Sequence, residues 1–284
     1  MVIGEGLPNK VLVGDGGLAL IAGPCAIESR SHTLFMAEKL FEQSSKAGLP
    51  LVFKACFDKD CRSSINSFHG VGLEEGLEIL SEVRREFGIP VVSDFSESHL
   101  GEAVGEVVDL IQIPAYLCRQ TSILRAAAKT NKPVHLKKGQ YMSPWNMRNS
   151  VDKLKSYNPN VEVILTDRGT FFGYNQLVND FSGLEIMRET GAPVGFDATH
   201  SIQMPTSFGE ISGGQRRFIP SLVRAACAIG IDVLFMEVHD NPSEALSDPN
   251  TQLPLEFFGE VIKQAQMIND FTRNQGFFDD LGVY

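Results

Sequence analysis

Short runs of apolar and β-branched residues alternate along the chain with longer segments of helical period. The runs have the length of β-strands and cover residues 19–22, 51–54, 90–93, 110–113, 134–136, 161–166, 194–197 and 233–237. The helical segments cover residues 31–47, 73–87, 97–107, 121–130, 146–157, 181–190, 218–229 and 255–275. Eight βα units with right-handed crossovers close most simply as a (β/α)8 barrel, the TIM barrel. A doubly wound open sheet is the alternative, because periodicity alone does not show closure.

A hairpin pattern precedes the first βα unit. Val11–Val13 and Leu18–Leu20 flank Asp15-Gly16-Gly17, which is typical of a tight turn between two strands. We therefore predict an N-terminal β-hairpin over about residues 10–21 that closes the bottom of the barrel. No Ser/Gly/Pro-rich linker or break in composition divides the 284 residues, so we expect one domain over residues 1–284.

Composition narrows the class of protein. The formal net charge of −10 argues against nucleic acid and anionic membranes as partners. The longest apolar stretches are too short to span a bilayer, and Met1–Lys10 lacks the basic and apolar regions of a signal peptide. Five cysteines, an odd number without a small secreted framework around them, are typical of a reducing compartment. We expect a cytoplasmic protein.

Four side chains with metal-binding chemistry stand at or just past the C-terminal ends of apolar runs. They are Cys25, His200, Glu237 and Asp248. A parallel barrel gathers these strand ends at one face, and thiolate, imidazole and carboxylate groups together suit a divalent metal. Each residue taken alone is more often packed, capped or solvated, so the interpretation rests on all four recurring in the same position.

Basic residues gather at the same strand ends, although the protein is acidic. They are Lys54, Lys59, Arg62, Lys137, Lys138 and Arg168. Residues 57–64 combine cations with hydroxyl groups, which suits phosphate or carboxylate recognition. A lysine that directly follows apolar strand residues is costly to desolvate without a partner. We therefore predict an anion site, with a solvated basic face as the alternative. Gln112, at the end of the fourth strand, either binds ligand or satisfies a backbone group.

Three other histidines carry less information about function. His32, His99 and His135 have no pattern of partners in the sequence, so we expect surface or packing roles for them.

Four segments resemble a known enzyme family. They read IAGPCAIES at residues 21–29, FKACFDKDCRSS at 53–64, IQIPAYLCRQT at 111–121 and RGTFFGYN at 168–175. In this order they are similar to the 3-deoxy-D-manno-octulosonate 8-phosphate synthases, and the similarity runs from about Val11 to Pro254. The resemblance implies a TIM barrel, a homotetramer, and condensation of phosphoenolpyruvate with D-arabinose 5-phosphate in the synthesis of lipopolysaccharide. The family's metal-dependent branch has Cys at the position of Cys25, so the chain resembles that branch.

Roles for individual residues follow from the resemblance. It assigns a divalent metal (Mn, Fe, Co or Zn) to Cys25, His200, Glu237 and Asp248. It assigns phosphoenolpyruvate to Lys54, Lys59, Gln112, Ala115, Lys137 and Arg168. The aldose phosphate falls to Arg62 and Ser63, with Arg119 reaching the site of a neighbouring subunit. Cys61 and Ser96 depart from the family, which usually has Asn and His there; Cys61 replaces an amide donor to the aldose by a weakly bonding thiol.

The expected mechanism follows from charge. Two anionic substrates must meet in a desolvated site, and Lys54, Lys137 and Arg168 would oppose their charges. Carbon 3 of the enol attacks the aldehyde, water adds at carbon 2, and phosphate leaves. A metal either orients the aldehyde or lowers the pKa of the attacking water, and the sequence does not decide between these. Lys59 is expected to donate a proton, because neighbouring cations would shift it toward neutrality.

Two alternatives stay open. A 3-deoxy-D-arabino-heptulosonate 7-phosphate synthase uses erythrose 4-phosphate as the acceptor, but such enzymes usually carry a Lys-Pro-Arg-Thr-Ser motif that is absent here. A non-catalytic barrel that binds sugar phosphates is the other alternative.

Overall fold

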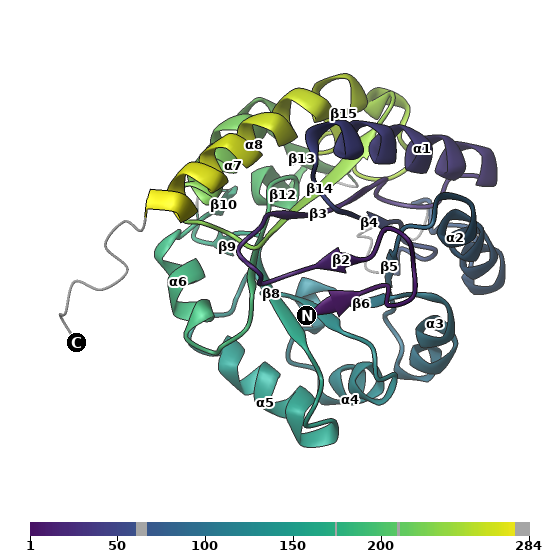
Figure 1. The fold of residues 1–284 in the computed structure, drawn as a ribbon, viewed down its shortest axis with the longest axis horizontal. Coiled ribbons are helices and arrows are strands. Elements are labelled where there is room, and N and C mark those ends of the chain that lie inside the picture. Colours follow the sequence, from purple (N-terminus) through teal and green to yellow (C-terminus); the bar gives the residue numbers. More distant parts are fainter. Residues whose placement is uncertain (61–66, 174, 209–210, 276–284) are drawn as a thin grey trace.

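The computed structural model describes residues 1–60, 67–173, 175–208 and 211–275. Its centre is a closed ring of parallel strands (Figure 1). The strands are β3 (Ala19–Gly23), β4 (Leu51–Lys54), β5 (Val91–Asp94), β6 (Leu110–Ile113), β7 (Val134–Lys137), β8 (Val163–Asp167), β11 (Val194–Asp197) and β14 (Val233–His239). Each pairs with the next along the chain, and β14 pairs with both β11 and β3. The predicted TIM barrel is confirmed, and the open sheet is excluded.

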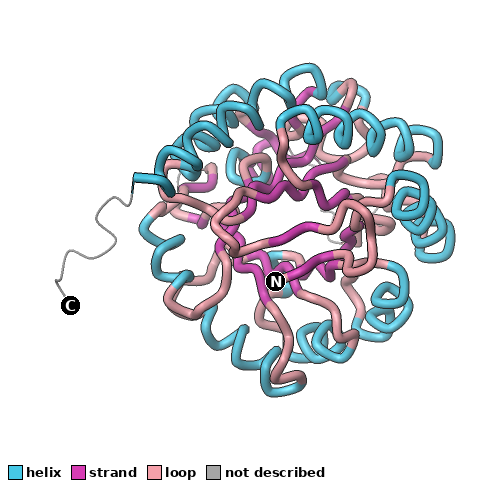
Figure 2. The backbone as a smooth tube through the Cα atoms, in the orientation of Figure 1, coloured by secondary structure: helices cyan, strands magenta, loops and turns pink. Residues whose placement is uncertain are grey.

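A ring of helices surrounds the barrel (Figure 2). They are α1 (Arg30–Ala47), α2 (Leu73–Phe87), α3 (Gly101–Val107), α4 (Thr121–Lys129), α5 (Met147–Tyr157), α6 (Ser182–Arg188), α7 (Ile219–Cys227) and α8 (Leu255–Gln275). Each lies where the sequence predicts a helix. The boundaries follow local chemistry: the Ser29 side chain accepts a hydrogen bond from the His32 N–H at the start of α1, and Gly48 ends that helix in the left-handed region with φ 71°.

Alternation along the strands gives the barrel two environments. Outward-facing residues such as Leu20 and Phe53 pack under the helices. Inward-facing residues form a second apolar cluster, which includes Val52, Leu110 and Phe235. Side chains two residues apart point the same way. Lys54, Gln112, Asp197 and Glu237 therefore also point inward, and each lies at or near the C-terminal end of its strand. The interior is apolar at the bottom and charged toward the C-terminal ends of the strands.

The N-terminal hairpin is confirmed, but its predicted position is wrong. β1 (Val2–Ile3) pairs antiparallel with β2 (Val11–Leu12). Residues 18–20, expected as the second arm, instead enter barrel strand β3, where Leu20 pairs with β4 and β14. The pairing differs because an apolar run serves a barrel strand as well as a hairpin arm. Ile3, Val11 and Val13 join the inner apolar cluster, so the hairpin closes the bottom of the barrel, as Figure 1 shows.

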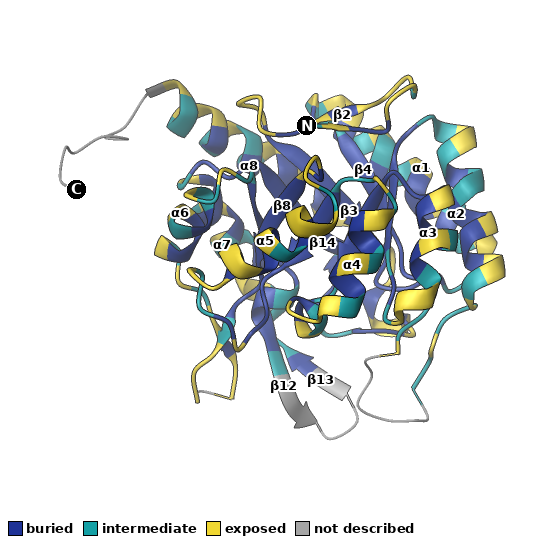
Figure 3. Ribbon diagram, turned by 90° about the horizontal axis from the view of Figure 1, so that it is seen from below, coloured by how far each residue is buried: buried dark blue, intermediate teal, exposed yellow. Residues whose placement is uncertain are grey.

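Short strands lie beyond the other end of the barrel. β9 (Thr170–Phe171) pairs with β10 (Leu177–Val178), and β12 (Gln203–Phe208) pairs with β13 (Ile211–Gly214). β15 (Leu253–Pro254) adds in parallel to the end of β14. In Figure 3, β12 and β13 project from the end of the molecule opposite the N-terminus. Among the residues described, no helix combines the length and apolar content needed to cross a bilayer.

Candidate functional site

Three of the four predicted metal ligands meet at the C-terminal end of the barrel. Cys25 follows β3, Glu237 lies in β14, and Asp248 lies in the loop before β15. All three are buried, and their ligand atoms lie within 4.8 Å of one another. Cys25 Sγ is 3.0 Å from Ser247 Oγ and 3.6 Å from Asp248 Oδ2. The structure therefore joins a thiol and two carboxylates from segments more than 200 residues apart.

His200 stands beside this cluster. It begins a short 3-10 turn (His200–Ile202) just after β11. Its Nε2 lies 3.6 Å from Glu237 Oε2, and its Nδ1 lies 2.7 Å from Asp197 Oδ2. A carboxylate on one ring nitrogen is the usual way in which proteins orient a metal-binding histidine. His200 thus faces Glu237 with the nitrogen that Asp197 leaves free.

The donor set fits a divalent transition metal. Glu237 Oε2 is buried and accepts no hydrogen bond from the residues that the structure describes, which is uncommon for a buried carboxylate oxygen. Burial raises the pKa of Cys25 well above its ordinary value, and the charge of Glu237 raises it further. The thiol is therefore neutral in the bare protein, and a cation would be needed to stabilise its thiolate. Sulfur, imidazole and carboxylate together suit zinc, iron or cobalt.

Two backbone features place these ligands. A Cβ at Gly23 would lie 1.8 Å from the carbonyl oxygen of Lys54, so only glycine lets β3 approach β4 at the turn into Cys25. Asp248 has a positive φ of 48°, a conformation that aspartate tolerates better than most residues.

Lys54 is enclosed by the four predicted metal ligands Cys25, His200, Glu237 and Asp248, which we call the metal-type cluster. Its side chain is 1% exposed, and Nζ donates to Glu237 Oε1 at 2.5 Å and to the Cys25 carbonyl at 2.8 Å. Burial acts against both charges, yet the pKa of Glu237 is lowered, chiefly by Lys54 and His200. Burial would lower the pKa of Lys54, but the Glu237 carboxylate and Cys56, which is a thiolate at the alkaline pH where a lysine titrates, raise it. Lys54 therefore holds the Cys25 loop and the Glu237 carboxylate together.

Lys137 forms a second buried ion pair, with Asp197. Its ammonium lies 3.0 Å from the centroid of the Phe235 ring, a cation–π contact. Burial lowers the pKa of Lys137 to about 8, although the charge of Asp197 opposes the shift. Asp197 bridges Lys137 and His200, a role that the sequence analysis missed. The signal was its place at the end of a strand, three residues before His200.

Arg168 is a buried cation that forms no ion pair with an acidic side chain among the residues described. It is 6% exposed, and its Nη2 donates to Gln203 Oε1 at 2.6 Å. Its Nη1 is buried and has no hydrogen-bond partner among the described residues. Leaving a buried charged donor unmatched is costly. An anionic oxygen in the barrel mouth would satisfy it.

The expected electrostatic state of Lys59 is wrong. Its Nζ lies 3.4 Å from Cys56 Sγ and 4.0 Å from Glu237 Oε1. Burial would lower its pKa, but Cys25, Cys56 and Glu237 raise it well above the ordinary lysine value, because all three are negatively charged at the alkaline pH where a lysine titrates. Lys59 therefore stays charged at neutral pH, where the Glu237 carboxylate faces it. Lys137 is the lysine whose pKa is shifted toward neutrality.

Gln112 is held by a buried histidine. Its Oε1 lies 3.2 Å from His135 Nδ1, and His135 Nε2 lies 2.8 Å from Thr166 Oγ1. His135 packs in the barrel interior rather than on the surface. Burial lowers its pKa well below the ordinary value, and the charge of Lys137 adds to this effect. Ala115, the other uncharged residue assigned to phosphoenolpyruvate, is buried at the start of a 3-10 turn (Ala115–Leu117).

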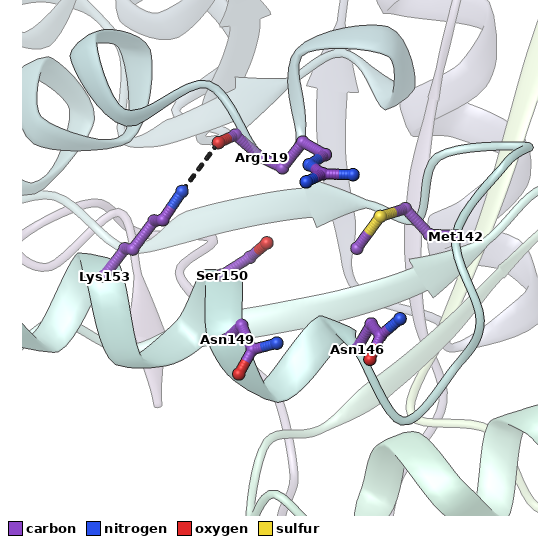
Figure 4. A pocket seen from close by; sticks show the side chains of 6 residues that line it. All are labelled: Arg119, Met142, Asn146, Asn149, Ser150 and Lys153. Carbon is purple, nitrogen blue, oxygen red and sulfur yellow. Dashed lines mark hydrogen bonds between the residues drawn. The ribbon is translucent and has the colours of Figure 1, made fainter.

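The residues expected to bind the aldose phosphate are only partly described. Cys61, Arg62 and Ser63 lie outside the described residues. Arg119 lines a separate pocket of about 270 Å³ together with Met142, Asn146, Asn149, Ser150 and Lys153. Figure 4 shows Arg119 and Lys153 at this pocket, where Lys153 Nζ donates to the Arg119 carbonyl at 2.9 Å. None of the metal-type residues lines it, so the structure does not bring Arg119 into the barrel mouth of its own chain.

Comparison with known proteins agrees with this architecture. The model of the DAHP synthetase I family matches residues 3–272. The 2-dehydro-3-deoxyphosphooctonate aldolase of Syntrophotalea carbinolica is 49% identical over 273 residues, which cover 94% of this chain and 98% of that protein. The enzyme of the same name from a Synechococcus species is 53% identical over 244 residues, covering 85% and 86%. That from Trichlorobacter lovleyi is 50% identical over 266 residues, covering 93% and 97%. The chain therefore belongs to the DAHP synthetase I family.

Proposed function

We propose that the chain condenses phosphoenolpyruvate with D-arabinose 5-phosphate and water to give 3-deoxy-D-manno-octulosonate 8-phosphate and inorganic phosphate, a step toward lipopolysaccharide. The relatives at about half identity bear the name 2-dehydro-3-deoxyphosphooctonate aldolase, which denotes this same enzyme. The structural observation that carries the proposal is Arg168, a buried guanidinium at the barrel mouth whose Nη1 has no hydrogen-bond partner in the part of the chain that the structure describes. It supports an anionic substrate directly above the apolar floor of the barrel.

Phosphoenolpyruvate would be held by cations from adjacent strands. Lys137 in β7 and Arg168 just past β8 face its carboxylate and phosphate, because these strands pair next to each other. Lys54 and Lys59 add positive charge on the opposite side, while Gln112 and Ala115 border the site. In this arrangement carbon 3 attacks the aldehyde, water adds at carbon 2, and the carbon–oxygen bond to phosphate breaks.

Proton transfer is best assigned to Lys137. Its pKa of about 8 lies near neutral pH, where a group both gives up and regains a proton readily. Lys59, with its raised pKa, would instead stay charged and stabilise the developing alkoxide. In the balanced reaction the water oxygen becomes the keto oxygen at carbon 2, and its two protons go to the aldehyde oxygen and to the departing phosphate.

Cys25, His200, Glu237 and Asp248 would hold a divalent metal such as Mn, Fe, Co or Zn. Such a metal supplies a Lewis acid that orients the aldehyde or lowers the pKa of the attacking water. Asp197 would keep His200 in the orientation that binding requires. Lys54 would keep Glu237 ionised.

The aldose phosphate would be bound by Arg62 and Ser63, with Cys61 beside them and Arg119 supplied by a neighbouring subunit of a homotetramer. The pocket in Figure 4 supports this, because it presents Arg119 apart from the metal-type residues of the same chain. Mixing an Arg119→Ala protein with a His200→Ala protein tests the arrangement. Mixed oligomers should recover activity that neither parent has, whereas no recovery would place Arg119 in its own subunit's site or outside any site.

Phosphate release distinguishes the candidate functions. The full chain should release phosphate from phosphoenolpyruvate rapidly with arabinose 5-phosphate and slowly with erythrose 4-phosphate. Preference for erythrose 4-phosphate would favour a 3-deoxy-D-arabino-heptulosonate 7-phosphate synthase, a reading related to the matched family description. No release with either aldose, with metal supplied, would favour a non-catalytic barrel. A cytoplasmic location, without nucleic-acid or membrane partners, stays a prediction from charge and composition.

A further inference from the structure

A second group of metal-type side chains lies at the end of β14, apart from the Cys25 cluster. Glu28 lies in the loop before α1, His32 in the first turn of α1, and His239 is the last residue of β14. Their ligand atoms lie within 4.8 Å of one another. The His239 side chain is 5% exposed, and those of Glu28 and His32 are 15% and 16% exposed. The proposed condensation uses none of the three.

Asp240 lies against both imidazoles. Its Oδ1 lies 3.0 Å from His32 Nε2 and 3.1 Å from His239 Nδ1. The two rings lie against each other, with their centroids 4.6 Å apart. The Asp240 carboxylate therefore hydrogen-bonds His32, the arrangement that supports metal-binding histidines, and lies beside Nδ1 of His239.

Of the other two ring nitrogens, His32 Nδ1 is buried and makes no hydrogen bond to any residue in the described part of the chain. His239 Nε2 is also buried and faces the Glu28 carboxylate. His239 Nε2 lies 3.3 Å from Glu28 Oε1. Two donors on one tetrahedral metal, each at about 2.1 Å, are separated by about 3.4 Å. The spacing of these two atoms suits two ligands of one ion, and it is also that of an ordinary contact between a histidine and a carboxylate.

One contact competes with this arrangement. The backbone N–H of Asn241 lies 3.0 Å from His239 Nδ1. Metal binding at Nε2 requires the ring to carry its proton on Nδ1 and to donate it to Asp240. The side chain of Asp240 is 41% exposed and lies within reach of that proton.

We propose that Glu28, His32 and His239 bind a second divalent transition metal, of the zinc or cobalt class. Two imidazoles and a carboxylate are common ligands for such ions, and the partial exposure of Glu28 and His32 leaves room for water in the remaining positions. The Leu246 N–H donates to Glu28 Oε1 at 2.8 Å, two residues before Asp248. Metal bound here would therefore also restrain the loop that carries Asp248.

Counting metal ions in ligand variants tests the proposal. The full-length protein, stripped of metal and dialysed against Co²⁺, should bind two equivalents per chain by mass spectrometry of the metal. His32→Ala and Glu28→Gln should each bind one and keep the thiolate-to-cobalt charge-transfer band of Cys25. Cys25→Ala should bind one and lose that band, and Cys25→Ala with His32→Ala should bind none. Far-UV circular dichroism would verify that each variant is folded.

A surface histidine provides the control. His99 has a side chain that is 71% exposed, and His99→Ala should still bind two equivalents. The proposal is overturned if folded His32→Ala and Glu28→Gln bind as much Co²⁺ as the unaltered protein, or if Cys25→Ala alone abolishes binding. An equivalent that survives in Cys25→Ala and is lost with His32→Ala supports the second site, even if the condensation activity is absent.

Discussion

Acidification should destabilise the protein through His135 at a pH where its carboxylates are still ionised. In the folded chain, His135 is buried between Gln112 and Thr166, and burial lowers its pKa well below the ordinary value of 6.5. In the unfolded chain the ring would titrate near that ordinary value. Below pH 6.5 the unfolded state therefore binds a proton that the folded state rejects. Stability contributed by the neutral ring is complete above pH 6.5 and is lost as the pH falls toward the folded pKa.

The magnitude follows from the linkage relation. Each pH unit below 6.5 removes about 1.4 kcal/mol from the free energy of unfolding until the folded pKa is reached. A loss of about 1.4 kcal/mol for each such unit is a sizeable part of the stability of an ordinary domain. Asp197 and Glu237, whose pKa values are lowered, contribute mainly below this window, because unfolded carboxyl groups titrate near pH 4.

Urea unfolding followed by circular dichroism, in steps from pH 8.0 to pH 5.0, measures the effect. His135→Asn keeps a donor near Gln112 but has no titrating ring, so its stability should fall less steeply than that of the unaltered protein by about 1.4 kcal/mol per pH unit. His99→Asn, at an exposed position, should keep the steeper dependence. Equal slopes for His135→Asn and the unaltered protein would refute the reasoning.

Three further predictions concern activity. Arg168→Lys keeps the charge but loses the forked donor, so the KM for phosphoenolpyruvate in steady-state kinetics should rise about tenfold to a hundredfold. The exposed control Arg224→Lys should leave this KM unchanged. An unaltered KM in Arg168→Lys would show that Arg168 does not bind phosphoenolpyruvate. Chelation should abolish phosphate release, and a divalent metal should restore it. Cys25→Asn should retain more activity than His200→Ala. Full activity after exhaustive chelation, with no metal found by elemental analysis, would contradict the metal assignment. Cys61→Asn should lower the KM for arabinose 5-phosphate about threefold to tenfold, because a neutral hydrogen bond is worth about 0.5–1.5 kcal/mol; a rise, or an equal change for phosphoenolpyruvate, would show that Cys61 has its own role.

The barrel was readable from the sequence because its signal is repetitive. Every barrel strand and every helix of the outer ring had a run of the right period, and the error at residues 18–20 arose where one apolar run served two possible pairings. Periodicity gives the type of an element but not its partner. The short pairing of Val2–Ile3 with β2 was not found, because two residues are too few to show a period.

The sequence predicted which charged residues lie at the C-terminal ends of the strands, but not which of them pair with each other. Position at a strand end identified Cys25, Glu237 and Lys137, since the barrel brings all strand ends to one face. The pairing of Lys137 with Asp197 and the raised pKa of Lys59 depend on distances across the barrel, which spacing along the chain does not encode. The cluster of His32 and His239 was missed for the same reason, because its members come from opposite ends of the sequence.

The left-handed backbone at Asp248 restricts what the metal-type cluster can become by mutation. A φ of 48° is adopted more readily by aspartate and asparagine than by other side chains, and β-branched or bulky residues are outliers there. Asn could therefore replace Asp with little disturbance of the loop, trading a charged ligand for a neutral one. Glutamate keeps the charge, but its backbone adopts this conformation less readily. At this position, conformation rather than ligand chemistry sets the range of accessible substitutions.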